Sequence, residues 1–99
     1  MNKKIYLECK DINYLPFDFY LPFYDILIEF DGEQHYFPVR FHGMDEQDAE
    51  NNFLYVQKHD KIKTNFCIEN GIPLIRIPYT ERGNIKIYLK EQLQILNIL

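Results

Sequence analysis

The stretch LPFDFYLPFYDILIEFDGEQH, residues 15–35, determines how the rest of this 99-residue chain is interpreted. Apolar and polar residues alternate on both sides of the segment PFYD at 22–25, which contains a proline and an aspartate. Such a pattern is typical of two strands joined by a turn. We therefore predict strands over Leu15–Leu21 and Ile26–Asp31.

Side chains alternate between the two faces of a strand, so each predicted strand divides its residues into two sets. In the first strand, one face is expected to carry Leu15, Phe17, Phe19 and Leu21, and the other Asp18 and Tyr20. In the second, one face is expected to carry Ile26, Ile28 and Phe30, and the other Leu27, Glu29 and Asp31.

The turn length predicts that three carboxylates share one face. A four-residue turn pairs Leu21 with Ile26, which places Asp18 opposite Glu29, with Asp31 next along that face. Like charges in this arrangement repel each other. The acids either form a solvated face that keeps the protein soluble, or they bind a hard divalent cation. We favour the cation, because Mg²⁺ prefers carboxylate oxygens and water.

A long helix is predicted over residues 46–70, with Asp45 as N-cap and Gly71 as the stop signal. At 3.6 residues per turn, one stripe of this helix carries Ala49, Phe53, Val56, Asp60, Lys63 and Cys67. Asp60 and Lys63 interrupt an otherwise apolar stripe. They form either a helix-surface pair worth about 0.2–0.5 kcal/mol or part of the same polar site as the strand acids. The pattern leaves both interpretations open.

The remaining elements are a strand at Ile5–Cys9, a strand at Pro73–Pro78 and a helix at Asn84–Leu96, with Tyr36–Gly43 irregular. The order β-β-β-α-β-α predicts an α/β fold with a mixed sheet and helices packed on it. A chain of this length has room for one hydrophobic core, so we predict a single domain over residues 1–99.

Composition narrows the class of protein. The chain is 46% hydrophobic and 16% aromatic, as expected of a globular protein. No apolar run approaches the ~18 residues of a membrane span, and no apolar stretch follows the basic start as in a signal peptide. Cys9 and Cys67 lie in apolar patterns, which predicts buried thiols and a cytoplasmic location.

Charge gives no support for a nucleic-acid partner. The net charge is −4, whereas nucleic-acid binders usually carry a basic excess. Residues 1–35 hold three Lys and seven Asp or Glu, a balance of −4, so the negative charge is concentrated around the predicted strand pair. Bound cations would reverse the sign of the charge there.

The segment after the second strand adds a histidine. Gly32 lets the chain turn sharply and lets a ligand approach the backbone. His35, three residues later, is either a packing or capping residue, as a lone histidine usually is, or a general acid or base that works near neutral pH.

Residues 15–22 and 28–35, with 59–63 and 71–79, resemble the restriction-endonuclease-like PD-(D/E)XK superfamily. Within it, they are most similar to the branch of the very-short-patch mismatch-repair endonuclease and related phage and homing endonucleases. The resemblance implies a restriction-endonuclease-like core. It also implies Mg²⁺- or Mn²⁺-dependent hydrolysis of DNA phosphodiester bonds by a phage or mobile-element enzyme.

The resemblance also implies roles for individual residues. The metal ligands would be Asp18, Glu29 and Asp31. His35 would lie near the scissile phosphate, and Asp60 would match the helix aspartate of that branch. The implied catalytic set is Asp18, Glu29, Asp31, His35, Asp60 and Lys63, and the implied substrate contacts are Gln34, Lys61, Lys63 and Arg76.

Two departures from the family pattern support a second hypothesis. Asp31 stands where the (D/E)XK motif has lysine, and the helix that supplies a further glutamate before the first strand is lacking, with Glu8 the only nearby candidate. A second copy of the chain or a protein partner would then complete the fold, or the chain is a trimmed domain. Alternatively, the chain is an inactive nuclease-fold protein, such as a phage inhibitor or accessory factor, that binds nucleic acid or another protein. A structural role, with the apolar segment Leu93–Leu99 packed on a partner, is a third hypothesis.

Overall fold

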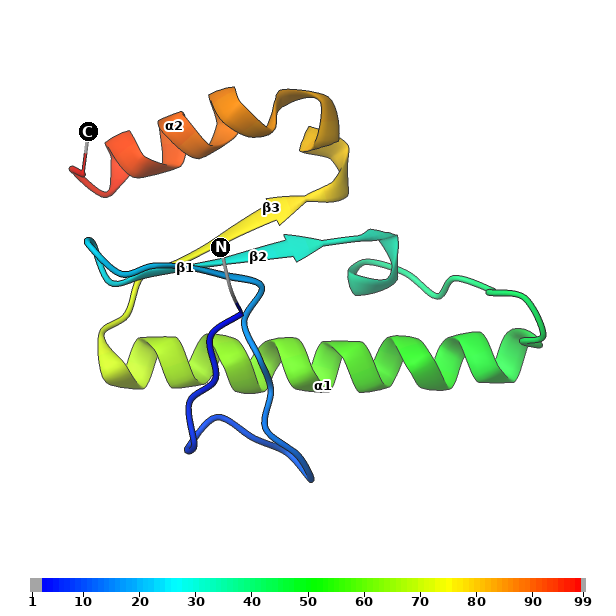
Figure 1. The fold of residues 1–99 in the computed structure, drawn as a ribbon. Coiled ribbons are helices and arrows are strands. Elements are labelled where there is room, and N and C mark those ends of the chain that lie inside the picture. The colour runs from blue at the N-terminus through cyan, green and yellow to red at the C-terminus, as the bar shows by residue number, and fades with distance from the viewer. Residues whose placement is uncertain (1–2, 99) are drawn as a thin grey trace.

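The structure is a computed structural model and describes residues 3–98. Its elements are β1 (Phe19–Leu21), β2 (Ile26–Asp31), α1 (Glu46–Asn70), β3 (Leu74–Pro78) and α2 (Ile85–Ile95), with short 3₁₀ turns at Glu33–His35 and Tyr79–Asn84. The two helices lie on opposite faces of the sheet, with α1 on one side and α2 on the other (Figure 1). The predicted mixed α/β architecture is confirmed.

The sheet has three strands in the order β1-β2-β3, of which β2 pairs antiparallel with β1 and parallel with β3. Leu21 pairs with Ile26 across a turn at 22–25, so the predicted register is confirmed. The same register, extended by one residue beyond Phe19 and Ile28, places Asp18 opposite Glu29.

The predicted strand at Ile5–Cys9 is wrong. Residues 7–9 form a turn and a bend, and the backbone contacts with the predicted hairpin are isolated ones, a bridge from Lys4 to Phe17 and a hydrogen bond from the Leu15 amide to the Cys9 carbonyl at 3.0 Å. In Figure 1 the segment before β1 runs across α1 as irregular chain. An apolar pattern of five residues does not by itself distinguish a strand from an ordered loop whose side chains enter the core.

The first strand of the predicted pair is also shorter than expected, since it begins at Phe19 instead of Leu15. Leu15 and Phe17 pack into the core under α1, whereas Phe19 and Leu21 pack under α2. The prediction that these four share one face is therefore wrong. Strict alternation holds only where the backbone is regular, and the chain bends at Asp18.

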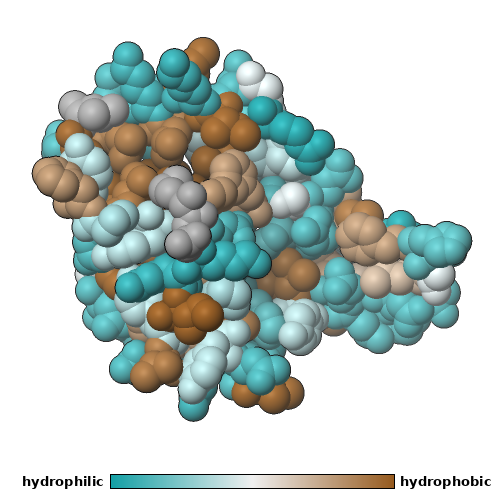
Figure 2. All heavy atoms as spheres, viewed as in Figure 1, coloured by the Kyte–Doolittle hydropathy of each residue, from teal (hydrophilic) through white to brown (hydrophobic). Residues whose placement is uncertain are grey.

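Two cores result, one on each face of the sheet. The first contains the buried side chains of Cys9, Leu15, Phe17, Leu27, Phe66 and Cys67. The second contains Ile26, Ile28, Ile75 and Ile77, covered by residues of α2. Figure 2 shows apolar side chains gathered between α2 and the sheet, while the end of α1 that projects beyond the sheet is mostly hydrophilic.

The bounds of α1 match the prediction because both of its ends carry strong local signals. Asp45 Oδ1 accepts from the Asp48 amide at 2.8 Å, and Asp48 Oδ2 accepts from the Asp45 amide at 3.3 Å, which forms a capping box. Gly71 ends the helix in the left-handed conformation with φ of 65°. Among the described residues, neither α1 nor α2 combines the length and the apolar character needed to cross a membrane.

Gly71→Ala is expected to lower the free energy of unfolding by about 1 kcal/mol, because a side chain at positive φ is strained. Gly83→Ala is the matched control, since Gly83 lies in a 3₁₀ turn and a Cβ there meets nothing within 4 Å. Urea unfolding measures both. Equal stability of the two variants would contradict the role of Gly71 as the helix stop.

Candidate functional site

Two carboxylates are buried on the face of β2 that α1 covers. Glu29 is 3% exposed and Asp31 is 5% exposed. The three residues Leu27, Glu29 and Asp31 alternate with the apolar set that faces α2, as the sequence predicted. A carboxylate removed from water in this way needs hydrogen bonds and a positive partner.

Glu29 obtains its partner from the middle of α1. Lys63 Nζ donates to Glu29 Oε1 at 2.9 Å, and the same ammonium lies 5.4 Å from the centre of the Phe17 ring. Burial raises the pKa of Glu29 to about 7, Lys63 opposes that shift and the nearby Asp18 adds to it. Lys63 therefore occupies the apolar stripe of α1 because it neutralises a buried strand acid.

Asp18 lies beside this pair, immediately before β1. Its Oδ2 accepts a hydrogen bond from the Phe30 amide at 2.9 Å, which fixes the carboxylate at the end of the hairpin register. One oxygen of Asp18 is thereby engaged by the backbone, and the carboxylate lies within reach of Glu29. Asp18 raises the pKa of Glu29 because two neighbouring carboxylates repel each other when both are ionised. A cation bound between them would remove that repulsion.

The second acid of β2 belongs to a separate network with His35. His35 Nδ1 is 2.6 Å from Asp60 Oδ2 and 3.5 Å from Asp31 Oδ1. The 3₁₀ turn at Glu33–His35 directs the imidazole back toward α1. The hydrogen bond to Asp60 raises the pKa of His35, so the imidazolium is stabilised and the ring is held in one orientation.

Arg76 of β3 ties this network together. Its Nη1 donates to both oxygens of Asp31, at 3.0 and 3.2 Å, and its Nη2 donates to the Asp60 carbonyl and the Thr64 hydroxyl, each at 3.0 Å. The sequence suggested that Arg76 contacts substrate. In the structure these contacts position Asp31 and α1, and a contact of Arg76 with substrate stays a prediction.

Two groups of donor atoms in this region have the chemistry to hold a metal. Ligand atoms of Asp31, His35 and Asp60 all lie within 4.8 Å of one another, but a guanidinium already occupies both oxygens of Asp31. Asp18 and Glu29 offer the carboxylate oxygens that Mg²⁺ prefers, and a cation there would remove their mutual repulsion. The second group consists of carboxylates alone, which suits Mg²⁺, but Lys63 already bonds Glu29 there as Arg76 bonds Asp31 in the first.

An open hollow of about 280 Å³ gives access to these side chains. It is lined by Leu15, Pro16, Asp18, His35, Val56, His59, Asp60 and Lys63. Four of the six predicted catalytic residues therefore line one hollow, and the other two, Glu29 and Asp31, lie buried directly beneath it.

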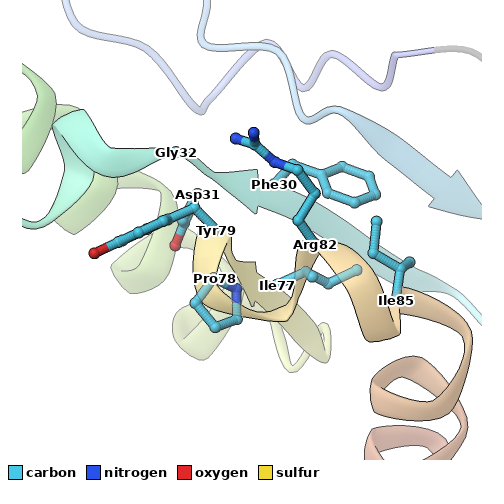
Figure 3. A pocket seen from close by; sticks show the side chains of 8 residues that line it. All are labelled: Phe30, Asp31, Gly32, Ile77, Pro78, Tyr79, Arg82 and Ile85. Atoms are coloured by element: carbon cyan, nitrogen blue, oxygen red, sulfur yellow. The ribbon is translucent and has the colours of Figure 1, made fainter.

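A smaller hollow of about 80 Å³ opens at the ends of β2 and β3. Figure 3 shows its lining, with Phe30, Ile77 and Ile85 forming an apolar wall beside Tyr79 and Arg82. Of the predicted site residues it contains only Asp31, whose carboxylate is held by Arg76. We therefore place the candidate site in the larger hollow on the α1 side.

The remaining sequence predictions fall near the site but not in it. Lys61 is exposed on α1, and Gln34 is half-buried in the 3₁₀ turn. Gly32 adopts an ordinary extended conformation with φ of −69°, so it does not supply the sharp turn that was expected. A Cβ at Gly32 would lie 2.7 Å from Gln34 Oε1, so the glycine makes room for that side chain.

His59 is a site residue to which the sequence gave little weight. It lines the hollow with Lys63, four residues later on the same helix face, and that spacing was the available signal. Its Nε2 lies 3.0 Å from Asp11 Oδ2, and Lys58 Nζ lies 3.2 Å from Asp11 Oδ1. These contacts hold the segment before β1 against α1.

Comparison with known proteins found two viral relatives. The chain is 35% identical over 68 residues to uncharacterized protein 033L of Invertebrate iridescent virus 3, which covers 69% of this chain and 33% of that protein. It is also 35% identical over 86 residues to uncharacterized protein 307L of Invertebrate iridescent virus 6, which covers 86% of this chain and 41% of that protein. The chain thus spans less than half the length of either relative. No protein-family model and no solved structure matches it.

Lys63→Met is expected to lower the free energy of unfolding by about 3 kcal/mol at pH 8, because it leaves Glu29 buried without its cation. In the wild type, the raised pKa of Glu29 means that the folded protein binds more protons than the unfolded chain between pH 4.5 and about 7. The contribution of Glu29 to the free energy of unfolding therefore falls as the pH rises through that range. At pH 5 Glu29 is largely protonated in both folded proteins, so the loss at pH 5 is expected to be at least about 1 kcal/mol smaller.

Urea unfolding at pH 5 and pH 8 measures the effect, and Glu29→Gln added to Lys63→Met should remove its pH dependence. An equal loss of stability at both pH values would show that Lys63 acts through packing alone.

Proposed function

We propose that this chain is a metal-dependent endonuclease that hydrolyses DNA phosphodiester bonds. The observation that carries the proposal is the convergence of Asp18, Glu29 and Asp31 on one sheet face, beneath a helix that contributes Asp60 and Lys63 to the same open hollow. In metal-assisted hydrolysis the protein's side chains fix the coordination of the ion, and carboxylates gathered at one hollow are able to do so.

Asp18 and Glu29 would hold Mg²⁺ or Mn²⁺, and Asp31, which the sequence also assigns to the metal, would support the site through its network with Arg76. A bound Mg²⁺ supplies a water of lowered pKa and offsets the charge that develops on the phosphate. The protein's contribution is to keep the two acids together and to exclude the solvent that would otherwise separate them.

In this scheme Lys63 has two possible partners, the Glu29 carboxylate and a phosphate oxygen of the substrate. Without a divalent cation, its ammonium neutralises Glu29 at 2.9 Å. With the charge of Glu29 offset by a metal ion, Lys63 becomes available for a phosphate oxygen in the hollow that it lines. Its position between the acid and the hollow supports a role in binding substrate.

His35 would move a proton. With a proton on Nδ1 directed to Asp60 Oδ2, the Nε2 atom of the imidazole is available to accept a proton from water or to donate one to the leaving oxygen. Asp60 then sets the orientation of the ring and stabilises the charged form, as carboxylates beside histidines do. Asp60 is a positioning residue in this scheme.

Several predictions from the sequence remain predictions of this proposal. These are a DNA partner, a phage or mobile-element source, and a second copy or protein partner that completes the fold. Cys9 and Cys67 are free and buried, which supports the predicted cytoplasmic location. Glu8, the candidate for the missing glutamate, is exposed in a turn and does not line the candidate site.

An inactive nuclease-fold protein that binds nucleic acid or another protein is the second candidate function. The observation that favours it is the pairing of three of the four site acids: Glu29 has Lys63, Asp31 has Arg76 and Asp60 has His35. Such pairs hold the fold together without any metal. The two functions are distinguished by whether the protein binds a divalent cation through Asp18 and cleaves DNA with it.

Asp18→Asn is expected to abolish Mn²⁺ binding in calorimetry and the Mn²⁺-dependent nicking of supercoiled plasmid. Asparagine keeps an oxygen that can accept from the Phe30 amide, so the fold should be retained. Glu50→Gln removes the same charge from an exposed site on α1 and should change neither measurement. Unaltered Mn²⁺ affinity in Asp18→Asn would overturn the metal site, and binding without nicking by the wild type would favour the second function.

A further inference from the structure

A second hollow of about 260 Å³ adjoins the candidate site. It is lined by Asp11, Ile12, Asn13, Tyr14, Leu15, Tyr55 and His59. Two of these residues, Leu15 and His59, also line the hollow that contains Asp18, His35, Asp60 and Lys63. The two hollows are therefore neighbours along α1, and a ligand group bound in one is within reach of the other.

The walls of this second hollow are fixed on both sides. The segment before β1 is closed by a bridge between Lys10 and Tyr14 and by a hydrogen bond from the Leu15 amide to the Cys9 carbonyl at 3.0 Å. Asp11 anchors the segment to α1 through His59 and Lys58. The hollow is thus an ordered surface whose two sides, residues 11–15 and α1, are held at a set separation.

The side chains around the second hollow are of the kind that bind nucleobases. The rings of Tyr55 and His59 lie with centroids 4.0 Å apart, and Tyr55 is 56% exposed, so the pair forms a partly open aromatic surface beside the hollow. Tyr14 and Ile12 add exposed aromatic and apolar surface opposite. Asn13 brings an amide, which can both donate to and accept from a base edge.

We propose that the second hollow is a subsite for an unpaired nucleobase, adjacent to the nucleotide whose phosphate lies in the candidate site. The inference rests on the proposed function and specifies its substrate class as single-stranded or locally unpaired DNA. A base inside a duplex has both faces covered by its neighbours and cannot enter a hollow between aromatic rings. Stacking on aromatic side chains is the general way in which proteins hold unpaired bases.

The test measures the binding of a fluorescein-labelled oligothymidylate to the whole chain by anisotropy, at low salt and with EDTA present. Tyr55→Ala is expected to weaken binding about tenfold, because it removes the stacking surface, and Tyr55→Phe should restore it. Tyr24→Ala is the matched control, since Tyr24 is a similarly exposed tyrosine in the turn between β1 and β2, and it should bind like the wild type. Unlabelled duplex of equal length should compete more weakly than the unlabelled single strand.

Absence of oligothymidylate binding by the wild type, equal affinity of Tyr55→Ala, or equal competition by duplex would each overturn the subsite. Because EDTA removes divalent cations, binding is scored independently of cleavage. If the wild type nicks plasmid but Tyr55→Ala binds the oligonucleotide as tightly as the wild type, the proposed function stands and the subsite does not. If binding depends on Tyr55 but the wild type does not cleave, the subsite stands and the endonuclease activity does not.

Discussion

The burial of two carboxylates on one face of β2 is the constraint on which the rest of this structure depends. Glu29 and Asp31 are almost fully withdrawn from water, and an uncompensated charge in that position would cost several kcal/mol. Lys63 from α1 and Arg76 from β3 supply the compensation. These two ion pairs specify how α1 lies on the sheet, because a rotation of the helix by one residue would separate Lys63 from Glu29.

The same two pairs shape the candidate site. Lys63 extends from α1 to Glu29 and also lines the hollow. This one side chain therefore compensates a buried acid and contributes to the candidate site. Arg76 fixes Asp31 and the backbone of Asp60, and Asp60 in turn orients His35. The polar groups of the site are thereby held by the fold itself, which is the arrangement that preorganised metal or acid–base chemistry requires.

Much of the fold and most of the site could be predicted where local signals were strong. Asp45 and Gly71 set the ends of α1 through a capping box and a left-handed stop, both of which depend on neighbouring residues alone. The turn at 22–25 fixed the hairpin register, and the interruption of an apolar helix stripe singled out Asp60 and Lys63 while leaving their role open. These features depend only on the spacing of residues along the chain, so they can be predicted from the sequence.

The parts that failed depend on contacts between distant residues. Of the apolar residues in 5–9 and 15–17, Cys9, Leu15 and Phe17 are buried in the core and Tyr6 packs against it, whereas Ile5 and Leu7 are exposed. The segments are loops packed on α1, and no local pattern separates that case from a strand. The partner of Glu29 is 34 residues away and that of Asp31 is 45 away, so the roles of Lys63 and Arg76 as compensating cations required the three-dimensional structure. The hollow beside Tyr55 likewise exists only because Asp11 pairs with His59 across 48 residues.

We propose that the sheet acids bind a divalent cation at Asp18 and Glu29 and not at Asp31, His35 and Asp60. An anomalous difference map from crystals grown or soaked with Mn²⁺ would locate the ion. We expect a single strong peak between the carboxylates of Asp18 and Glu29, with Arg76 still bonded to Asp31. A peak among Asp31, His35 and Asp60, or no peak in crystals whose Mn²⁺ concentration exceeds the needs of an ordinary site, would contradict it.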